Sequence, residues 1–531
     1  MSSPVLTNAV SPPELRNPAV HQSSPKFSRG KRVIIIIAAV AICVATGLAI
    51  LWSRIWPFTE KAVVEDLAEA SDSTVTIRGS HLTYFPSPGC ILEDVEFRHG
   101  PDKWTLITID KLTIEGSYSG ILTKQVPRIR AEGGHVFIPP FGSNVTFQTQ
   151  HSSIVVDEIV ANGTTVEFFQ DDPRKQPLRF DVHDADVRDV RWDRPMDYQL
   201  KFHNPEPPGE ISTRGKFGVW TRGKPGETPI SGEYTFEHAD LGVYGGIAGI
   251  LSSKGEYSGA LKHIDIAGVT DVPDFEVKMG GHKVKLETRY NAFVDAIHGD
   301  TFLKRIEGRF GRTKLIVEGS VAGTKGSKGK SALLDLNARQ GQIEDILGLF
   351  VKSRPSPMSG AIALRAKVQI PPGEESFLQK VKLQGTFGID DGSFSKPETQ
   401  KNVNELSAGA RGEKMDDAET VLTDLKGRVS LDGGIAQFSD LSFGIPGAKA
   451  RMYGTYNLIN QKIDLHGRMR VDTKISKTTT GVKSLFLKAI DPIFKKKKKG
   501  EVVPIHITGT YGHPQFGLDL SPQSDPAHQG K

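Results

Sequence analysis

Two stretches of the sequence contain residue types that could bind a phosphate group or a metal ion. Gly323–Ser331 reads GTKGSKGKS and approaches the nucleotide-binding pattern G-x-x-x-x-G-K-S, with one extra residue before Gly329. A phosphate-binding loop must lead into a helix whose first N–H groups point at the anion. Here Ala332, Leu334 and Leu336 recur at every second position, as in a strand. We therefore interpret the stretch as a hairpin loop.

The other stretch contains Asp181, His183, Asp184 and Asp186, whose side chains are common metal ligands. In a regular strand the first two point to one face and the last two to the other, so they cannot reach one ion without a bulge. We interpret them as the charges of a solvated edge strand. No other catalytic or metal-binding pattern is recognisable in the sequence. We therefore expect no enzymatic activity, no bound metal and no cofactor.

Charge and cysteine content argue against two further classes of protein. The 531 residues include 67 basic and 62 acidic side chains, a net charge of +5, without the concentrated basic face that nucleic acid requires. We therefore expect no nucleic-acid partner. Cys43 lies inside an apolar segment and Cys90 well beyond it, so a disulfide between them is not expected. The 55 glycines and 32 prolines favour frequent tight turns.

The elements that carry these residues are mostly strands. Apolar residues recur at every second position over Val284–Tyr290, Ile362–Ile370 and Ala448–Leu458. This period of two is typical of a strand with one apolar face and one solvated face. Short connections between strands favour antiparallel neighbours. The turn sequences that punctuate the strands are Asp390-Asp391-Gly392, Asp432-Gly433-Gly434 and Asn460-Gln461.

A pattern of glycine and tyrosine repeats within the chain. GEYSGALKHIDIAG begins at Gly255 and GTYNLINQKIDLHG begins at Gly454, with Gly, Tyr, Ile-Asp and Gly at the same offsets. Such an echo is typical of an array in which each unit packs on its neighbours. Shorter Gly-x-aromatic versions begin at Gly215, Gly232, Gly308, Gly385 and Gly509.

Few segments have helical spacing. Ile343–Phe350 is one, and Val482–Ile490 is another, ended by Pro492. The basic amphipathic segment Val482–Lys499 has two interpretations: its apolar stripe packs on the β body, or it lies on a lipid surface whose anionic head groups meet the lysines. The residues of this candidate lipid-contact helix are Leu485, Phe486, Ile490, Lys483, Lys488 and Lys495.

An uncharged segment near the N-terminus is long enough to cross a bilayer. Val33–Trp52 has twenty residues, which as a helix span about 30 Å. Arg29, Lys31 and Arg32 precede it, and positive charge favours the cytoplasmic side, so we expect a cytoplasmic N-terminus. A cleaved signal peptide is the alternative, but its apolar region would be shorter. The anchor residues are Val33, Ile36, Val40, Leu48, Leu51 and Trp52.

The fold class that follows is mostly β. We expect a single N-terminal transmembrane helix followed by an elongated, curved antiparallel β-sheet with a few short helices, and the family resemblance given below implies that this β-sheet forms a groove. The regions are a disordered cytoplasmic tail (1–30), the transmembrane helix (31–56), three β regions (60–200, 201–330 and 331–520) and a disordered tail (521–531).

Several stretches resemble the AsmA-like family. Near the N-terminus these are Ser71–Phe97, above all its segment Tyr84–Gly89 (YFPSPG), and Ile107–Ser117. Near the C-terminus the similarity is carried by RMYGTYNLINQKIDLHGRMRVD, by TTTGVKSLFLKAIDPIF and by VPIHITGTYGHPQFGLDL, which begin at Arg451, Thr478 and Val503. The resemblance is weakest between about 180 and 330.

The resemblance implies a fold, a location and a function. Members of the family are anchored in the bacterial inner membrane with a β body in the periplasm, and resemble bridge-like lipid-transfer proteins. We accordingly expect phospholipid or another lipid and the inner membrane as partners, with an outer-membrane or periplasmic protein at the far end, and a role in outer-membrane assembly. A structural scaffold that carries no lipid is the alternative. The candidate groove-lining residues are Leu286, Ile362, Leu364, Val368 and Met452.

Overall fold

The computed structural model describes most of the chain beyond Trp56. The described residues are 42, 44, 46, 56–99, 104–139, 154–169, 177–191, 193–221, 224–244, 246–278, 280–296, 298–323, 329–373, 375–411, 422–471, 502–510 and 513–519. Contacts divide the chain into two units, Met1–Pro57 and Phe58–Lys531. The boundaries expected inside the second unit, near residues 200 and 330, stay predictions.

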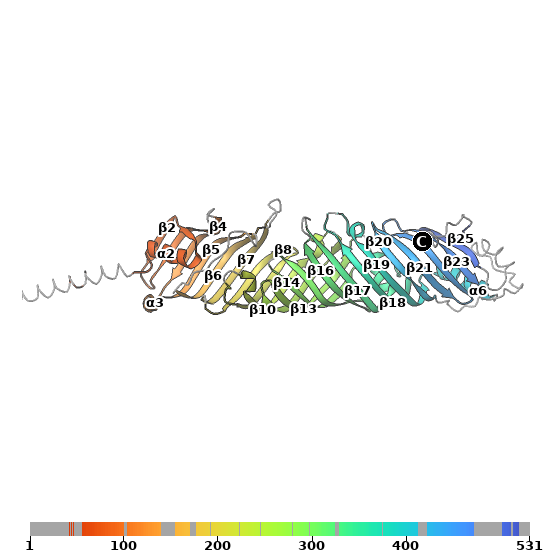
Figure 1. Ribbon diagram of the computed structural model, residues 1–531, viewed down its shortest axis with the longest axis horizontal. Coiled ribbons are helices and arrows are strands. Elements are labelled where there is room, and N and C mark those ends of the chain that lie inside the picture. The colour runs from red at the N-terminus through yellow and green to blue at the C-terminus, as the bar shows by residue number, and fades with distance from the viewer. Residues whose placement is uncertain are drawn as a thin grey trace, which may run out of the picture. The chain divides into compact units, whose positions relative to one another are not determined.

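The second unit is built on one curved sheet whose strands follow one another in chain order (Figure 1). The mostly β fold is therefore confirmed. The strands are β1 (Thr74–Thr76), β2 (Gly79–Thr83), β3 (Gly89–His99), β4 (Trp104–Glu115), β5 (Gln125–Ile138), β6 (Val155–Phe168), β7 (Leu178–Val190), β8 (Met196–Pro205), β9 (Pro208–Phe217), β10 (Pro229–Asp240), β11 (Ile247–Ala248), β12 (Ile250–Ala260), β13 (His263–Val277), β14 (Val284–Asp295), β15 (Asp300–Phe310), β16 (Thr313–Gly323), β17 (Lys330–Gln342), β18 (Met358–Ile370), β19 (Lys382–Phe394), β20 (Thr423–Asp432), β21 (Ile435–Ile445), β22 (Ala448–Asn457), β23 (Lys462–Val471), β24 (Val502–Thr510) and β25 (His513–Leu518).

Strand pairing departs from a simple meander at only a few places in the described part of the chain. β5 and β6 pair in parallel, whereas the other described pairs are antiparallel. β1 and β2 both pair with β3, and β10 pairs with β12 while the short β11 pairs with β13. The pairing of β17 with β16 confirms that a strand, and not a helix, follows Gly323–Ser331.

Two of the three expected turns are confirmed. Gly433 and Gly434 join β20 to β21 with φ of 56° and 77°, the left-handed conformation that a two-residue hairpin turn requires. Asn460-Gln461 lies between β22 and β23. The turn expected at Asp390–Gly392 is wrong, because β19 continues through it to Phe394. Asp391 instead adopts a φ of 54° where the pairing with β18 shifts register, as in a β-bulge.

Short helices lie between strands. The helix expected at Ile343–Phe350 is confirmed as α4, whereas α6 has no clear apolar period in its sequence and was not expected. The N-cap of α2 is Thr59, whose hydroxyl accepts a hydrogen bond from Ala62 N. The helices are α2 (Glu60–Ser71), α3 (Tyr118–Thr123), α4 (Ile343–Phe350), α5 (Phe377–Lys380), α6 (Pro397–Arg411) and the 3-10 turns η1 (Pro225–Glu227) and η2 (Leu241–Tyr244).

The expected membrane segments fall almost wholly outside the described residues. Among the residues that are described, no helix is both long enough and apolar enough to cross a bilayer. Ile42, Val44 and Thr46 of the expected span are described, and they are helical and exposed. The anchor residues Val33, Ile36, Val40, Leu48, Leu51 and Trp52, both terminal tails and the segment Val482–Lys499 lie outside the described residues.

Candidate functional site

One face of the sheet carries an uninterrupted row of uncharged residues. The row takes one residue from each of β2–β10 and β12–β25, each directly opposite the next in the strand register. Its members are Leu82, Cys90, Ile114, Ile129, Ile159, Val187, Tyr198, Gly215, Gly232, Tyr257, Ile266, Ala292, Leu303, Gly319, Leu334, Val368, Leu383, Leu431, Ala436, Tyr456, Ile463, Gly509 and Pro514. We call the face that carries this row the apolar face.

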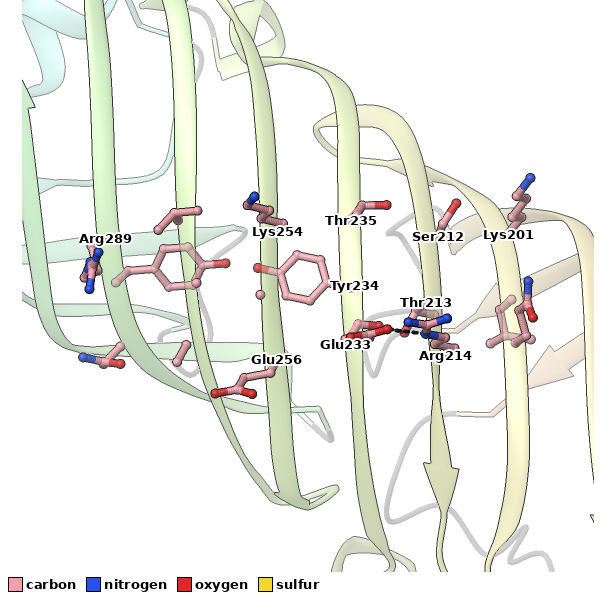
Figure 2. Close-up of a pocket in the computed structure, with 18 residues that line it drawn as sticks. Lys201, Ser212, Thr213, Arg214, Glu233, Tyr234, Thr235, Lys254, Glu256 and Arg289 are labelled. Atoms are coloured by element: carbon pink, nitrogen blue, oxygen red, sulfur yellow. Dashed lines mark hydrogen bonds and ion pairs between the residues drawn. The ribbon is translucent and has the colours of Figure 1, made fainter.

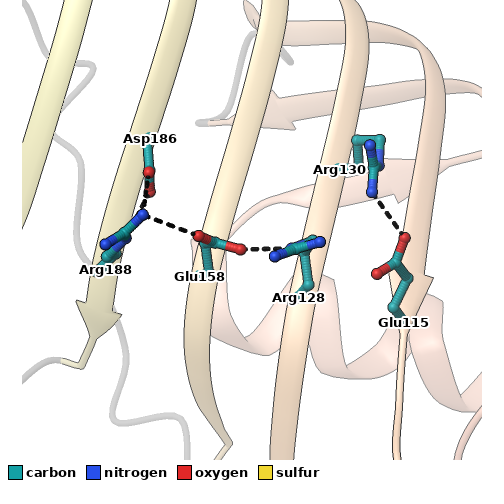
Figure 3. Close-up of polar contacts among 6 residues, drawn as sticks. All are labelled: Glu115, Arg128, Arg130, Glu158, Asp186 and Arg188. Atoms are coloured by element: carbon teal, nitrogen blue, oxygen red, sulfur yellow. Dashed lines mark hydrogen bonds and ion pairs between the residues drawn. The ribbon is translucent and has the colours of Figure 1, made fainter.

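The opposite face, here the polar face, carries charged side chains. From β4 to β9 one of its rows alternates in sign: Glu115, Arg128, Glu158, Arg188, Asp197 and Lys216. Figure 3 shows Glu158 between Arg128, with which it forms an ion pair, and Arg188 at 3.4 Å. Exposed ion pairs add little stability individually. Opposite charges directly across from each other do favour this register, including that of the parallel pair β5–β6.

All five candidate groove-lining residues lie on the apolar face. Leu286 shares the face with Ala292 of the uncharged row because the two are an even number of positions apart in β14, and Leu364 and Ile362 share it with Val368 in the same way. Leu286 and Leu364 are half-buried. Ile362, Val368 and Met452 are buried, and of these three Met452 lines the apolar cavity described next.

The apolar face encloses a cavity at its C-terminal part. The cavity has a volume of about 280 Å³, and all but His506 of its lining residues are apolar. Phe387 of β19, Phe438 of β21 and Ile507 of β24 contribute to the wall, and Val403 of α6 contributes as well. The volume is close to the lower end of the range for small-molecule pockets.

The cavity shows which way this part of the sheet curls. β19 and β24 are five strands apart, roughly 24 Å in a flat sheet at about 4.8 Å per step. Their side chains nevertheless line one cavity together with Val403 of α6, so the apolar face is concave at this place. α6 lies against the same side, where Val403 and Ala408 are buried and Ser407 donates a hydrogen bond to Pro446 O at 3.1 Å.

Tyrosines on the apolar face lie next to glycines of neighbouring strands. Tyr198 is opposite Gly215, which is opposite Gly232, which is opposite Tyr257. A Cβ atom on Gly232 would lie 2.7 Å from the Tyr257 hydroxyl oxygen, so the ring occupies the space that a side chain there would need. This arrangement gives the Gly-x-aromatic repeats of the sequence a physical role.

The same arrangement recurs one row further along the strands. Tyr234 is opposite Gly255, which is opposite Gly268, which is opposite Tyr290. These tyrosine hydroxyl groups are a feature of the candidate site that we did not expect. For Tyr234 and Tyr257 the signal was a glycine two positions earlier, which places both residues on one face of a strand, whereas Tyr198 and Tyr290 have no such glycine before them.

The polar face is also hollowed. A hollow of about 880 Å³ lies over β8–β14. Figure 2 draws the residues that line it, including the ion pair of Arg214 and Glu233 and also Tyr234. Two further hollows adjoin it and share lining residues with it or with each other. Charges of both signs line the first hollow, with Lys201, Lys254 and Glu256 among them. It therefore has the character of a solvated surface.

Of the stretches first considered for chemistry, residues 324–328 lie outside the described residues, and the segment from Asp181 to Asp186 lies in β7. The expectation that Asp181 and Asp184 point to opposite faces is wrong, because a register shift between Val182 and Asp184 places both on the polar face. β7 is also not an edge strand, since it pairs with both β6 and β8. No metal-binding group of His, Cys, Asp or Glu occurs among the described residues.

The only cysteine among the described residues is buried in the sheet. Cys90 belongs to β3 and is 1% exposed. Burial raises the pKa of its thiol to about 12, which leaves it protonated and unreactive at neutral pH.

No protein-family model, no curated protein and no solved structure matches this chain.

Proposed function

We propose that this protein binds phospholipid on its apolar face and passes it along that face between the inner and outer membranes of a bacterial envelope. The observation that supports the proposal best is the uncharged row that continues from β2 to β25, on the same face as the apolar cavity near the C-terminal end. Lipid chains are a natural cover for such a face, because soluble proteins rarely expose large apolar patches to water.

The energetic need for such a surface is large. Moving one acyl chain of about fifteen methylenes into water costs about 12 kcal/mol, at ~0.8 kcal/mol per methylene. A second chain roughly doubles this cost. A face that keeps both chains out of water would remove most of this barrier. No bond is made or broken in such a transfer, so the proposal requires no catalytic residue.

The location in the envelope rests on the sequence. The uncharged segment Val33–Trp52 would anchor the chain in the inner membrane, with the β body in the periplasm. The resemblance to AsmA-like proteins supports the same arrangement. A partner at the outer membrane and the candidate lipid-contact helix within Val482–Lys499 belong to this proposal as well.

Charged substitutions on the two faces test the function. Leu364→Glu places a carboxylate on the apolar face, and Leu333→Glu places one on the polar face, where Leu333 is 52% exposed. We expect Leu364→Glu and Leu286→Glu to reduce transfer of a fluorescent phosphatidylglycerol between vesicles by the full-length protein at least tenfold. Leu333→Glu should leave it within about twofold, because a charge costs little where water already reaches.

A structural scaffold is the second candidate function. The observation in its favour is that Ile362, Val368 and Met452 are buried by other side chains, so part of the apolar face serves as an ordinary core. A scaffold would move no lipid between vesicles in the same experiment. Transfer that is absent in the unsubstituted protein would favour the scaffold, and transfer that survives both substitutions on the apolar face would contradict the lipid path.

A further inference from the structure

Hydroxyl groups interrupt the apolar face in its middle part. Between β8 and β14, hydroxyl groups on this face form three hydrogen-bonded clusters. The first cluster is Tyr198, Thr213 and Tyr257, the second is Tyr234, Ser253 and Tyr290, and the third is Thr270 and Thr288. All eight residues are half-buried.

The first cluster is closed in the sense that a chain of hydrogen bonds uses every hydroxyl hydrogen and ends on a backbone carbonyl oxygen. Tyr198 contacts the Tyr257 hydroxyl, which is 2.7 Å from Thr213 Oγ1, and Thr213 in turn donates to Glu233 O at 2.9 Å. Each hydroxyl hydrogen thus has an acceptor within the protein. We regard this cluster as a structural tie across β8–β12.

The second cluster is held loosely. The hydroxyl oxygens of Tyr234 and Tyr290 lie 3.3 and 3.2 Å from Ser253 Oγ, whereas O–H···O bonds are usually about 2.7–2.8 Å long. Ser253 donates its own hydrogen to Val269 O at 3.1 Å, so both phenols must donate to the same serine oxygen. The two phenol hydroxyl groups are therefore weakly bound donors that share one acceptor, Ser253 Oγ. A stronger acceptor placed beside them could accept a hydrogen bond from either phenol in its place.

The surroundings of the second cluster are apolar on the same face. Leu200 and Ile306 lie in the register row of Tyr234 and Tyr290, one on each side of the pair. Beyond Ile306 this row continues without a charged residue through β16–β20 to Phe438 and Leu465, which line the apolar cavity. An acyl chain could lie on this row with its polar end at the tyrosines.

We propose that Tyr234 and Tyr290 donate hydrogen bonds to the ester carbonyl oxygens of an acyl lipid whose chains lie on the apolar face. A carbonyl oxygen accepts hydrogen bonds but cannot donate them, which matches two phenol donors. Burial raises the pKa of Tyr234, so its phenol stays a donor at any physiological pH. The inference rests on the proposed function and deepens it, because it makes the protein selective for lipids with ester-linked chains.

The test compares two lipids that differ only at the carbonyls. Fluorescent diester phosphatidylglycerol and its diether analogue with the same chains are bound to the full-length protein, and the ratio of the two dissociation constants is measured. We expect the unsubstituted protein to prefer the diester by roughly three- to tenfold, as for one or two hydrogen bonds. Tyr234→Phe combined with Tyr290→Phe removes both donors, keeps both rings and should bring the ratio close to one.

Two controls separate binding from folding. Tyr198→Phe combined with Tyr257→Phe alters the closed cluster and should lower thermal stability without changing the ratio. Tyr453→Phe removes a hydroxyl from the polar face and should change neither quantity. Equal binding of the two lipids by the unsubstituted protein, or a preference that survives in the Tyr234/Tyr290 variant, would overturn the inference while leaving the lipid path intact. Failure to bind either lipid would remove the proposed function itself.

Discussion

At the scale of single residues, one histidine makes the attachment of the last described strand, β25, depend on pH. His466 Nδ1 lies 2.8 Å from the carboxylate of Asp519, which follows β25 and is 5% exposed, and His466 Nε2 lies 3.1 Å from Asp464. The hydrogen bond to Asp519 raises the pKa of His466 above its usual value of about 6.5, against the effect of burial. His506 and Tyr453 face the same ring, each with a centroid separation of 6.3 Å.

The raised pKa predicts a weaker attachment of β25 at high pH. A histidine whose pKa is raised in the folded protein stabilises it fully below about pH 6.5, and this contribution is lost as pH rises through the folded-state value. We expect hydrogen-exchange protection factors of β24 and β25 to fall as pH is raised from about 6 to 8. Asp519→Asn should weaken this dependence, because only the smaller effect of Asp464 remains, and an unchanged pH profile in that variant would contradict the assignment.

Single residues also mark the limit of sequence-based expectation. Alternation alone placed Leu286, Leu364 and Met452 on one face, because a period of two is fixed by strand geometry. The bulge in β7 has a signal in the sequence that we did not use, because the apolar alternation of Phe180 and Val182 resumes one residue out of phase at Ala185 and Val187. The bulge places Asp184 on the same face as Asp181, whereas a regular strand would place the two on opposite faces.

At the scale of elements, the glycines inside strands are of two kinds: those whose missing side chain would clash with a neighbouring strand, and those with open space at that position. A Cβ on Gly215 would lie 2.0 Å from Ser231 O in the adjacent strand, so Gly215→Ala must push β9 and β10 apart. We expect a loss of about 1–3 kcal/mol in the free energy of unfolding, as for other overpacked sites. Gly388 in β19 has nothing within 4 Å of the same position. Gly388→Ala should therefore be neutral or stabilising by about 0.5–1 kcal/mol.

Urea titration of both glycine variants measures these values. The comparison is matched, because each substitution adds one methyl group inside a strand. Similar losses in the two variants would mean that backbone freedom, and not the close approach of a neighbouring strand, sets the cost.

Helices show why some elements were predictable and others not. α4 was expected because Ile343, Ile346 and Leu347 form an apolar stripe. α6 begins with Pro397 and is mostly polar, and its described buried residues include Val403 and Ala408. Such a helix is positioned by the sheet that it covers, so its own sequence carries little signal.

At the scale of the whole second unit, neighbouring strands supply most contacts. In such an array, stability is approximately a sum of local terms and unfolding need not occur in one step. We expect urea unfolding to give different midpoints for the two ends of the sheet. Trp104 in β4 reports on one end, and Tyr453→Trp in β22 supplies a probe for the other, in versions that each keep one tryptophan. Coincident midpoints would show that the sheet unfolds as a single cooperative body.

Strand order also bears on how the chain is made. Most strands pair with the segment synthesised immediately before them, so a hairpin can close as soon as its second half leaves the ribosome or a translocation pore. Each completed hairpin then offers a template edge to the next one. The parallel pair β5–β6 is different, because β6 can align only after the intervening chain has returned to the rim at which β5 began. A pause in vectorial folding is therefore expected between Ile138 and Val155, with β1–β5 already assembled upstream.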